Sequence, residues 1–169
     1  FIERRPNSIL IDKFPLNITT THLIWRVFPH AKFILALRHP CDVCLSCFMQ
    51  SFGMNTAMAN FLTLEDTVNL YARIMGFWRQ CPRTLPLQYH RIKYEGIVAD
   101  MESETRMLLN FLGGEWDNAI FRHSDHARKR GVIDTPSYHQ VSQPIYQHAR
   151  YRWRNYADLF EPFMETLLP

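Results

Sequence analysis

Short continuous apolar runs alternate along this chain with longer stretches in which apolar residues recur at helical spacing. The runs 9–12 (ILID), 33–37 (FILAL) and 87–94 (LQYHRIKY) predict three short strands. A continuous run such as 33–37 is typical of a strand covered on both faces. A helical pattern separates the first two strands, which predicts a βαβ unit with a right-handed crossover.

Helix boundaries are marked by residues that satisfy or tolerate free backbone groups. Pro40 suits a first helical position, Thr63 with Asp66 forms a capping box, and Asp100 is a preferred N-cap residue. The sequence therefore predicts an α/β fold with a parallel sheet flanked by helices. The expected helices lie approximately at residues 20–28, 40–52, 64–81, 101–112 and 151–168.

Composition limits the class of protein. The chain has 169 residues, 47% of them hydrophobic and 21% charged, so we expect one domain over residues 1–169. A net charge of +3 fits a small anionic ligand but is too weak to indicate nucleic acid. We find no apolar run long enough for a membrane span, and four scattered cysteines favour a reducing, cytoplasmic location. The first residue is Phe1 rather than methionine, so we expect a piece of a longer protein.

Arg38 stands where a strand is expected to end and a helix to begin. The free N–H groups of such a helix, the fork of Arg38 and the hydroxyl of Ser46 could together hold a phosphate. The alternative is that Arg38 only pairs with Asp42 and that Ser46 faces solvent. Lys13 and Tyr94 also stand at expected strand ends, where a solvated charge and a buried tyrosine are the simpler interpretations.

Three cysteines open an iron–sulfur-like pattern. Cys41, Cys44 and Cys47 have C-x2-C-x2-C spacing, but the position of the fourth ligand is Ser51. We therefore interpret the three as small apolar residues of a reduced protein.

Residues 122–146 precede the last helix without a regular apolar pattern. His123 and His126 have metal-ligand spacing, but a solvated basic loop is the better interpretation. Residues 132–146 are polar and interrupted by two prolines, too irregular for a helix or strand, which predicts an ordered loop crossing a site.

Four segments stand in register along the chain: 12–17 (DKFPLN), 28–32 (FPHAK), 38–42 (RHPCD) with Ser46, and 135–141 (TPSYHQV) with 152–156 (RWRNY). Together they closely resemble the PAPS-dependent sulfotransferases, in which PAPS is 3′-phosphoadenosine 5′-phosphosulfate. The resemblance extends from Ile9 to Leu168 and is nearest to bacterial TPR-containing proteins related to tyrosylprotein sulfotransferases. It implies a P-loop-NTPase-like three-layer fold and, in the longer protein, upstream TPR repeats.

The resemblance implies a role for six residues. Arg38 and Ser46 match the pair that holds the 3′-phosphate of PAPS, Tyr94 a residue beside the adenosine, and Arg152 a basic residue reaching the donor's phosphates. Lys13 matches the lysine that stabilises the transferring sulfuryl group, and Ser137 a serine donating a hydrogen bond at the same place.

The family's phosphosulfate loop, which precedes the Asp-Lys-x-Pro segment, has no counterpart here. All six glycines stand at position 53 or later, and no residue matches the general base. The chain thus resembles the C-terminal portion of the domain, without its first strand and phosphosulfate loop.

The expected activity is sulfuryl transfer from PAPS to a hydroxyl or amine of a small-molecule or peptide acceptor, by in-line displacement and without a metal, leaving 3′,5′-ADP (PAP). Two alternatives stay open. One is a truncated or degenerate nucleotide-binding or interaction module without catalysis. The other is a kinase-like phosphotransferase, for which we find neither a Walker loop nor magnesium-binding carboxylates.

Overall fold

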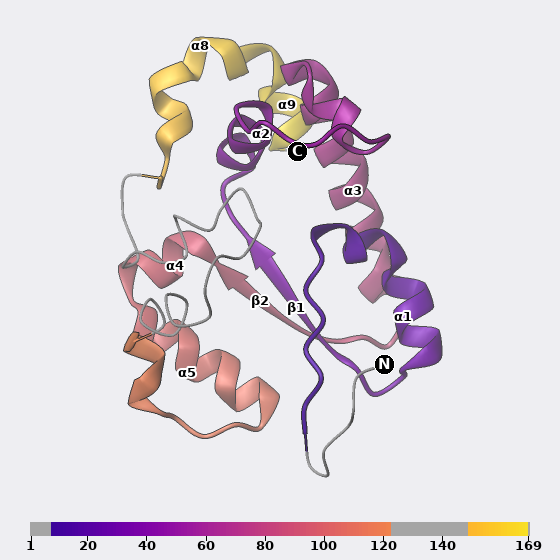
Figure 1. Cartoon of the computed structure of the whole chain (residues 1–169), viewed down its shortest axis with the longest axis vertical. Helices are drawn as coiled ribbons and strands as arrows, with labels where there is room; N and C mark the ends of the chain where they lie inside the picture. Colours follow the sequence, from indigo (N-terminus) through magenta and orange to yellow (C-terminus); the bar gives the residue numbers. More distant parts are fainter. Residues whose placement is uncertain (1–7, 123–148, 169) are drawn as a thin grey trace.

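A computed structural model describes residues 8–122 and 149–168 of the chain (Figure 1). It is a mixed α/β structure with two parallel strands flanked by helices, as the sequence predicts. The elements are, in order, η1 (Pro15–Thr20), α1 (Thr21–Val27), β1 (Lys32–Leu37), α2 (Pro40–Phe48), η2 (Met58–Phe61), α3 (Leu64–Thr84), β2 (Gln88–Lys93), α4 (Tyr94–Ala99), α5 (Met101–Leu112), η3 (Asn118–Arg122), η4 (Arg152–Tyr156), α8 (Ala157–Phe160), η5 (Glu161–Phe163) and α9 (Met164–Leu167).

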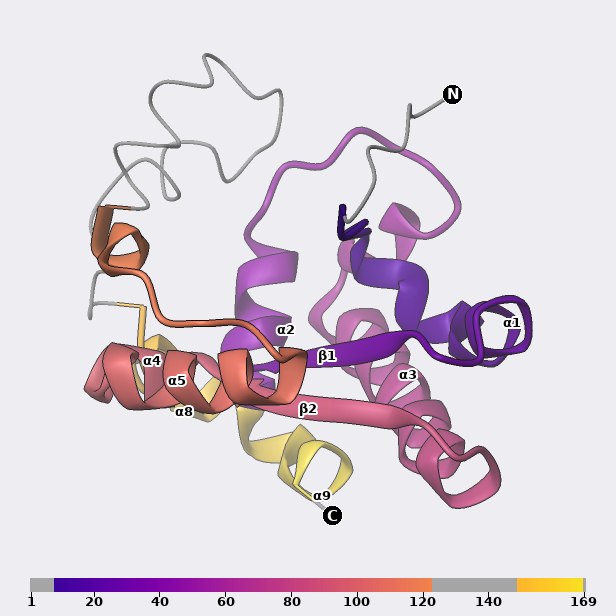
Figure 2. The same cartoon turned by 90° about the horizontal axis from the view of Figure 1, so that it is seen from below.

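The two strands pair in parallel, with Lys32 opposite Gln88 and Leu37 opposite Lys93. They lie side by side in both views (Figures 1 and 2). Because the pairing is parallel, both strands end at the same edge of the sheet. The chain leaves β1 into α2 and leaves β2 into α4, so the starts of these two helices lie near each other.

Helices contact both faces of this sheet. On one face, Trp78 of α3 makes an edge-to-face contact with Tyr89 of β2, with ring centroids 5.6 Å apart. On the other face, the rings of His90 and Phe111 of α5 are 5.5 Å apart. The Lys32 ammonium also donates to the carbonyl of Phe111 at the end of α5, 2.8 Å away.

The main core lies beyond the carboxyl end of β1, where α2, α3, α8 and α9 meet (Figure 1). Phe160 and Val68 are fully buried at its centre. Cys41 and Cys44 pack there too, which confirms the prediction that they serve as small apolar residues. The buried members are Cys41, Cys44, Leu45, Val68, Phe160 and Leu167.

The predicted helix signals act locally as expected. The Thr63 hydroxyl accepts the N–H of Asp66 at 3.1 Å and donates to its carboxylate at 2.7 Å. Asp100 caps α5 by accepting the N–H of Ser103 at 3.0 Å, and Gly113 ends that helix in the left-handed conformation, with φ at 78°. Glycine suits this position because it lacks a Cβ.

Several predicted elements differ from the structure. Residues 9–12 form no strand, and Ile9 and Ile11 are 84% and 80% exposed, so the predicted βαβ unit is absent. No strand of the described chain pairs with them, and an extended apolar segment without hydrogen-bonding partners gains nothing from the strand conformation. The parallel crossover instead joins β1 to β2 through α2 and α3.

The prediction that β1 is covered on both faces is also wrong. Leu35 is 9% exposed, whereas Ile34, on the face toward α5, is 44% exposed. On this face, α5 contacts His90, which lies opposite Ile34 on β2, and Lys32, two residues before Ile34 on β1. The helix after β1 ends at Phe48 rather than near residue 52, and α3 continues through Pro82 to Thr84. Proline there removes only one helical hydrogen bond, in the last turn.

None of the helices in the described ranges is both long and apolar enough to cross a membrane.

We predict that Thr63→Ala lowers the free energy of unfolding by about 1 kcal/mol, because it removes the side-chain cap of the longest helix. Urea unfolding monitored by circular dichroism measures the change. The midpoint urea concentration should fall, while the dependence of the unfolding free energy on urea concentration stays the same. Thr56→Ala is the matched control, expected to change stability by less than about 0.5 kcal/mol. Equal effects of the two substitutions would contradict the capping role.

Candidate functional site

The site is built where the two strands end. Arg38 directly follows β1, and its side chain is 23% exposed. One guanidinium nitrogen, Nη2, donates to the carbonyl oxygen of Ala149 at 2.5 Å. The guanidinium carbon lies 5.2 Å from the ring centroid of Tyr94, the first residue of α4. Two of the residues singled out in the sequence are therefore in direct contact.

Glu95 joins the ends of the two strands. Its Oε1 accepts a hydrogen bond from the backbone N–H of His39, the N-cap residue of α2, at 2.7 Å. A carboxylate is favourable at this position because the start of a helix carries partial positive charge. It also means that one N–H group near the start of α2, where the sequence suggested phosphate binding, is already satisfied.

Asp42 ties the C-terminal part of the chain to α2. Its carboxylate is buried, 1% exposed for the residue, and accepts two backbone N–H groups. Oδ2 accepts from Tyr151 at 2.7 Å and Oδ1 from Trp153 at 2.9 Å. The Nη2 atom of Arg38 lies 3.9 Å from Oδ1, so the ion pair weighed as an alternative role for Arg38 is present but long.

Aromatic rings also pack where the two strands end. This region, called the corner below, consists of Arg38, His39, Asp42, Tyr94, Glu95 and residues 149–153. His39 stacks on Trp153 with centroids 4.9 Å apart and planes 15° apart, and it meets Tyr151 edge to face at 5.8 Å. Within the described residues, Arg38 Nε, His39 Nδ1 and Trp153 Nε1 are buried and have no hydrogen-bond partner. A buried N–H without an acceptor is costly, and a negatively charged ligand could accept hydrogen bonds from the Nε–H of Arg38 and the Nε1–H of Trp153.

Ser46 and Arg152 are the other predicted residues on α2 and η4. Ser46 is exposed, one helical turn after Asp42, as the simpler interpretation expects. Arg152 is exposed at the start of η4, next to Trp153. Ser137 and the predicted loop 132–146 lie outside the described residues.

Lys13 stands apart from the contacts described above. It is exposed, lies in a segment without regular structure, and makes no hydrogen bond or ion pair within ranges 8–122 and 149–168. The predicted strand that would have placed it at the sheet edge does not form.

The cysteines are buried thiols. Burial, together with the neighbouring Asp42 charge, raises the pKa of Cys41 to about 11. Burial, together with Cys47 and Cys41, raises the pKa of Cys44 to about 12. Across the part of the chain that the structure describes, no three histidine, cysteine or acidic side chains are grouped to hold a metal ion.

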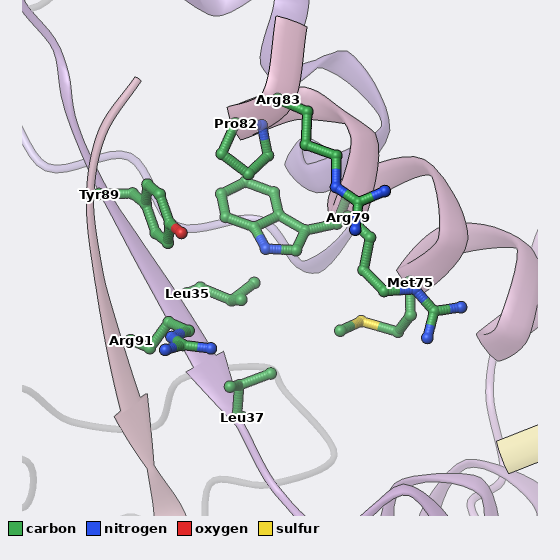
Figure 3. Close-up of a pocket in the computed structure, with 9 residues that line it drawn as sticks. Leu35, Leu37, Met75, Arg79, Pro82, Arg83, Tyr89 and Arg91 are labelled. Carbon is green, nitrogen blue, oxygen red and sulfur yellow. The ribbon is translucent and has the colours of Figure 1, made fainter. Parts of the chain in front are cut away.

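A cavity of about 360 Å³ lies elsewhere, between α3 and the sheet (Figure 3). Leu35 and Leu37 of β1 line it on one side, and Arg79 and Arg83 of α3 stand on the other. None of the site residues predicted from the sequence lines this cavity. The lining residues are Leu35, Leu37, Met75, Trp78, Arg79, Pro82, Arg83, Tyr89 and Arg91.

A family model described as the sulfotransferase family matches residues 2–118. The chain belongs to this family. The match includes Lys13, Arg38, Ser46 and Tyr94, so the corner described above falls within the family's shared sequence except for its C-terminal side.

The relatives of this sulfotransferase family member are longer than the chain itself. It is 28% identical over 157 residues to protein-tyrosine sulfotransferase 1 of Danio rerio, covering 88% of this chain and 42% of that protein. It is 22% identical over 158 residues to protein-tyrosine sulfotransferase 2 of Gallus gallus, covering 88% of this chain and 41% of that protein. An uncharacterised protein of Aquifex aeolicus (strain VF5) is 26% identical over 162 residues, with 94% of this chain and 20% of that protein covered. The chain thus spans less than half the length of these relatives.

Three of the residues that build the corner carried only weak signals in the sequence. Asp42 and Glu95 each look like an ordinary acid in the first turn of a helix, and Trp153 looks like part of an apolar helix face. Their partners are distant in sequence, so no local pattern could have identified them.

We predict that Cys41 and Cys44 react slowly with iodoacetamide in the folded chain. Only the thiolate reacts, and a pKa of about 12 leaves a thiolate fraction on the order of 10⁻⁴ at pH 8. Between pH 8 and 10 the rate should still rise about tenfold per pH unit, because both thiols stay mostly protonated. Mass spectrometry of each cysteine, with the guanidinium-unfolded chain as control, measures this. Rapid labelling of both in the folded chain would contradict the burial.

Proposed function

We propose that this chain forms the donor-binding part of a PAPS-dependent sulfotransferase, with the guanidinium of Arg38 binding the 3′-phosphate of PAPS. The observation that carries the proposal is the corner at the ends of β1 and β2 in a member of the sulfotransferase family. There Arg38 lies against Tyr94 and keeps its Nε buried without a partner among the described residues.

The chemistry of Arg38 suits a fixed phosphate. Its Nη2 is held by the Ala149 carbonyl, so the planar fork is oriented before a ligand arrives. A guanidinium that is already oriented loses less conformational entropy on binding, and it can offer parallel N–H groups to two phosphate oxygens. Tyr94 provides an aromatic surface beside it that would suit the adenosine.

Charge around the corner favours a dianion. The carboxylates of Asp42 and Glu95 both accept backbone N–H groups, so they are already engaged. Arg150, Arg152 and Arg154 follow on the segment that Asp42 holds, and the guanidinium of Arg154 lies 4.7 Å from the ring centroid of Tyr151. In the proposal, Arg152 reaches the phosphates of the donor from this segment, and Ser46 offers its hydroxyl from α2.

Transfer itself would be an in-line displacement. The acceptor oxygen forms a bond to sulfur while the bond from sulfur to the bridging phosphate oxygen breaks, 3′,5′-ADP leaves, and the proton of the acceptor hydroxyl passes to a base or to water. Lys13 and Ser137 would stabilise the moving charge with an ammonium and a hydroxyl. The names of two relatives suggest a tyrosine hydroxyl as the acceptor class.

A nucleotide-binding module without catalysis is the second candidate. It is favoured by one observation, that Lys13 is exposed and has no partner in the described residues. A lysine that is not positioned contributes little to transition-state stabilisation, because positioning accounts for most of the effect.

We predict that the chain binds 3′,5′-ADP at least about tenfold more tightly than 5′-AMP, because a charged hydrogen bond to the additional phosphate is worth roughly 1.5–3 kcal/mol. Isothermal titration calorimetry measures both affinities. Arg38→Ala should bring the affinity for 3′,5′-ADP down to that for 5′-AMP.

Arg106→Ala is the matched control for this titration. Arg106 pairs with Glu102 on the exposed side of α5, so its loss should leave both affinities unchanged. Equal binding of the two nucleotides by the unsubstituted chain would overturn the proposed donor site.

We predict that Lys13→Ala lowers the rate of sulfuryl transfer from PAPS to a tyrosine-containing peptide by at least about tenfold, while the affinity for 3′,5′-ADP changes less than twofold. Mass spectrometry of the sulfated peptide gives the rate, and Lys93→Ala, at another strand end, is the control. A chain that binds 3′,5′-ADP but sulfates no peptide would support the binding module instead.

A further inference from the structure

Asp42 is connected to Arg38 through a series of short contacts. Its carboxylate holds the N–H groups of Tyr151 and Trp153, and two residues before Tyr151 the carbonyl of Ala149 accepts from Arg38. The position of that carbonyl therefore depends on the hydrogen bonds made by Asp42. The segment 149–153 therefore connects the buried acid to the guanidinium through hydrogen bonds.

The direct contact between Asp42 and Arg38 is the weaker of the two connections. The ion-pair distance is 3.9 Å, longer than a hydrogen bond, and both oxygens of the carboxylate already accept a backbone N–H. Asp42 thus leaves donors of Arg38 available, and Nε is buried without a partner in the described chain. An acid that neutralised Arg38 directly would occupy the same donors that a phosphate needs.

The backbone at Tyr151 shows that this segment is held in place. Tyr151 has φ at 57°, the left-handed region that residues with a Cβ rarely adopt. Such a conformation persists only where surrounding contacts fix it. The N–H of Tyr151 donates to Asp42 at 2.7 Å, and the stacking of Trp153 on His39 holds the other side of the turn.

We propose that Asp42 is a positioning residue, which fixes the Arg38 guanidinium for an anionic ligand by holding the segment 149–153. This inference rests on the proposed function, because the anion is taken to be the 3′-phosphate of the nucleotide. Asp42 does not touch the ligand in this arrangement. It acts through two backbone N–H groups and one backbone carbonyl.

The test is a double-mutant cycle on nucleotide affinity. Asp42→Asn keeps the size of the side chain but replaces one acceptor oxygen with an NH₂ group that opposes a backbone N–H. Titration calorimetry should show about a tenfold loss of affinity for 3′,5′-ADP and less than a twofold change for 5′-AMP. In the Arg38→Ala background, Asp42→Asn should have no further effect.

Asp158→Asn is the matched control, because Asp158 is an exposed acid on the neighbouring helix α8. It should leave both affinities unchanged. Equal losses for 3′,5′-ADP and 5′-AMP in Asp42→Asn, or an additive effect in the Arg38→Ala background, would show a merely structural role and overturn the proposal.

The nucleotide affinities of the unsubstituted chain distinguish failure of the proposed function from failure of the positioning role alone. If it binds 3′,5′-ADP no more tightly than 5′-AMP, the proposed function fails and this inference fails with it. If it discriminates between them but Asp42→Asn does so equally well, only the positioning role is overturned.

If Asp42→Asn does not fold, amide hydrogen exchange in the unsubstituted chain tests the positioning role instead. Saturating 3′,5′-ADP should slow the exchange of the Tyr151 and Trp153 amides at least about fivefold, because the ligand and Asp42 hold the same segment. The amide of Ser103, which donates to the Asp100 cap of α5, is the internal reference and should not change. Unchanged exchange at Tyr151 and Trp153 would overturn the proposal.

Discussion

A buried carboxylate with two backbone partners holds the last part of this chain against the start of α2. Removing the Asp42 charge from water is unfavourable unless hydrogen bonds replace the lost hydration, and the N–H groups of Tyr151 and Trp153 do so. The bonds bring η4 onto α2, and the helices that follow reach the core, where Phe160 is fully buried. The corner containing Arg38 therefore depends on chain segments more than a hundred residues apart.

The two strand ends meet through a second carboxylate. Glu95, directly after β2, accepts the N–H of His39, directly after β1. Parallel pairing places both ends at one edge, and this hydrogen bond fixes the two helix starts to each other. As a result, Arg38 and Tyr94 are in contact although they are distant in sequence. Basic and aromatic side chains thus gather at an edge where sheets of this kind bind ligands.

How far the site could be predicted differs from residue to residue. Arg38 was placed correctly because a buried run followed by His39-Pro40 marks a strand that ends and a helix that begins. Tyr94 was placed at the end of β2 for a similar reason, and in the structure it opens α4. Lys13 was misplaced because ILID has the pattern of a strand, whereas a strand forms only beside a partner, and none in the described chain pairs with it. The roles of Arg38, Ser46, Tyr94, Arg152, Lys13 and Ser137 in binding and catalysis stay predictions.

By itself, the sequence determined the local features of this protein. The capping box of Thr63 and Asp66, the cap at Asp100 and the stop at Gly113 each depend on bonds between residues three to five apart, so their pattern is visible in the chain. Only the tertiary structure decided that Asp42 holds Tyr151 and Trp153 and that Glu95 holds His39. The physical reason is that these carboxylates bind backbone N–H groups, which every residue except proline carries. The sequence therefore does not indicate which distant N–H groups a given carboxylate will bind.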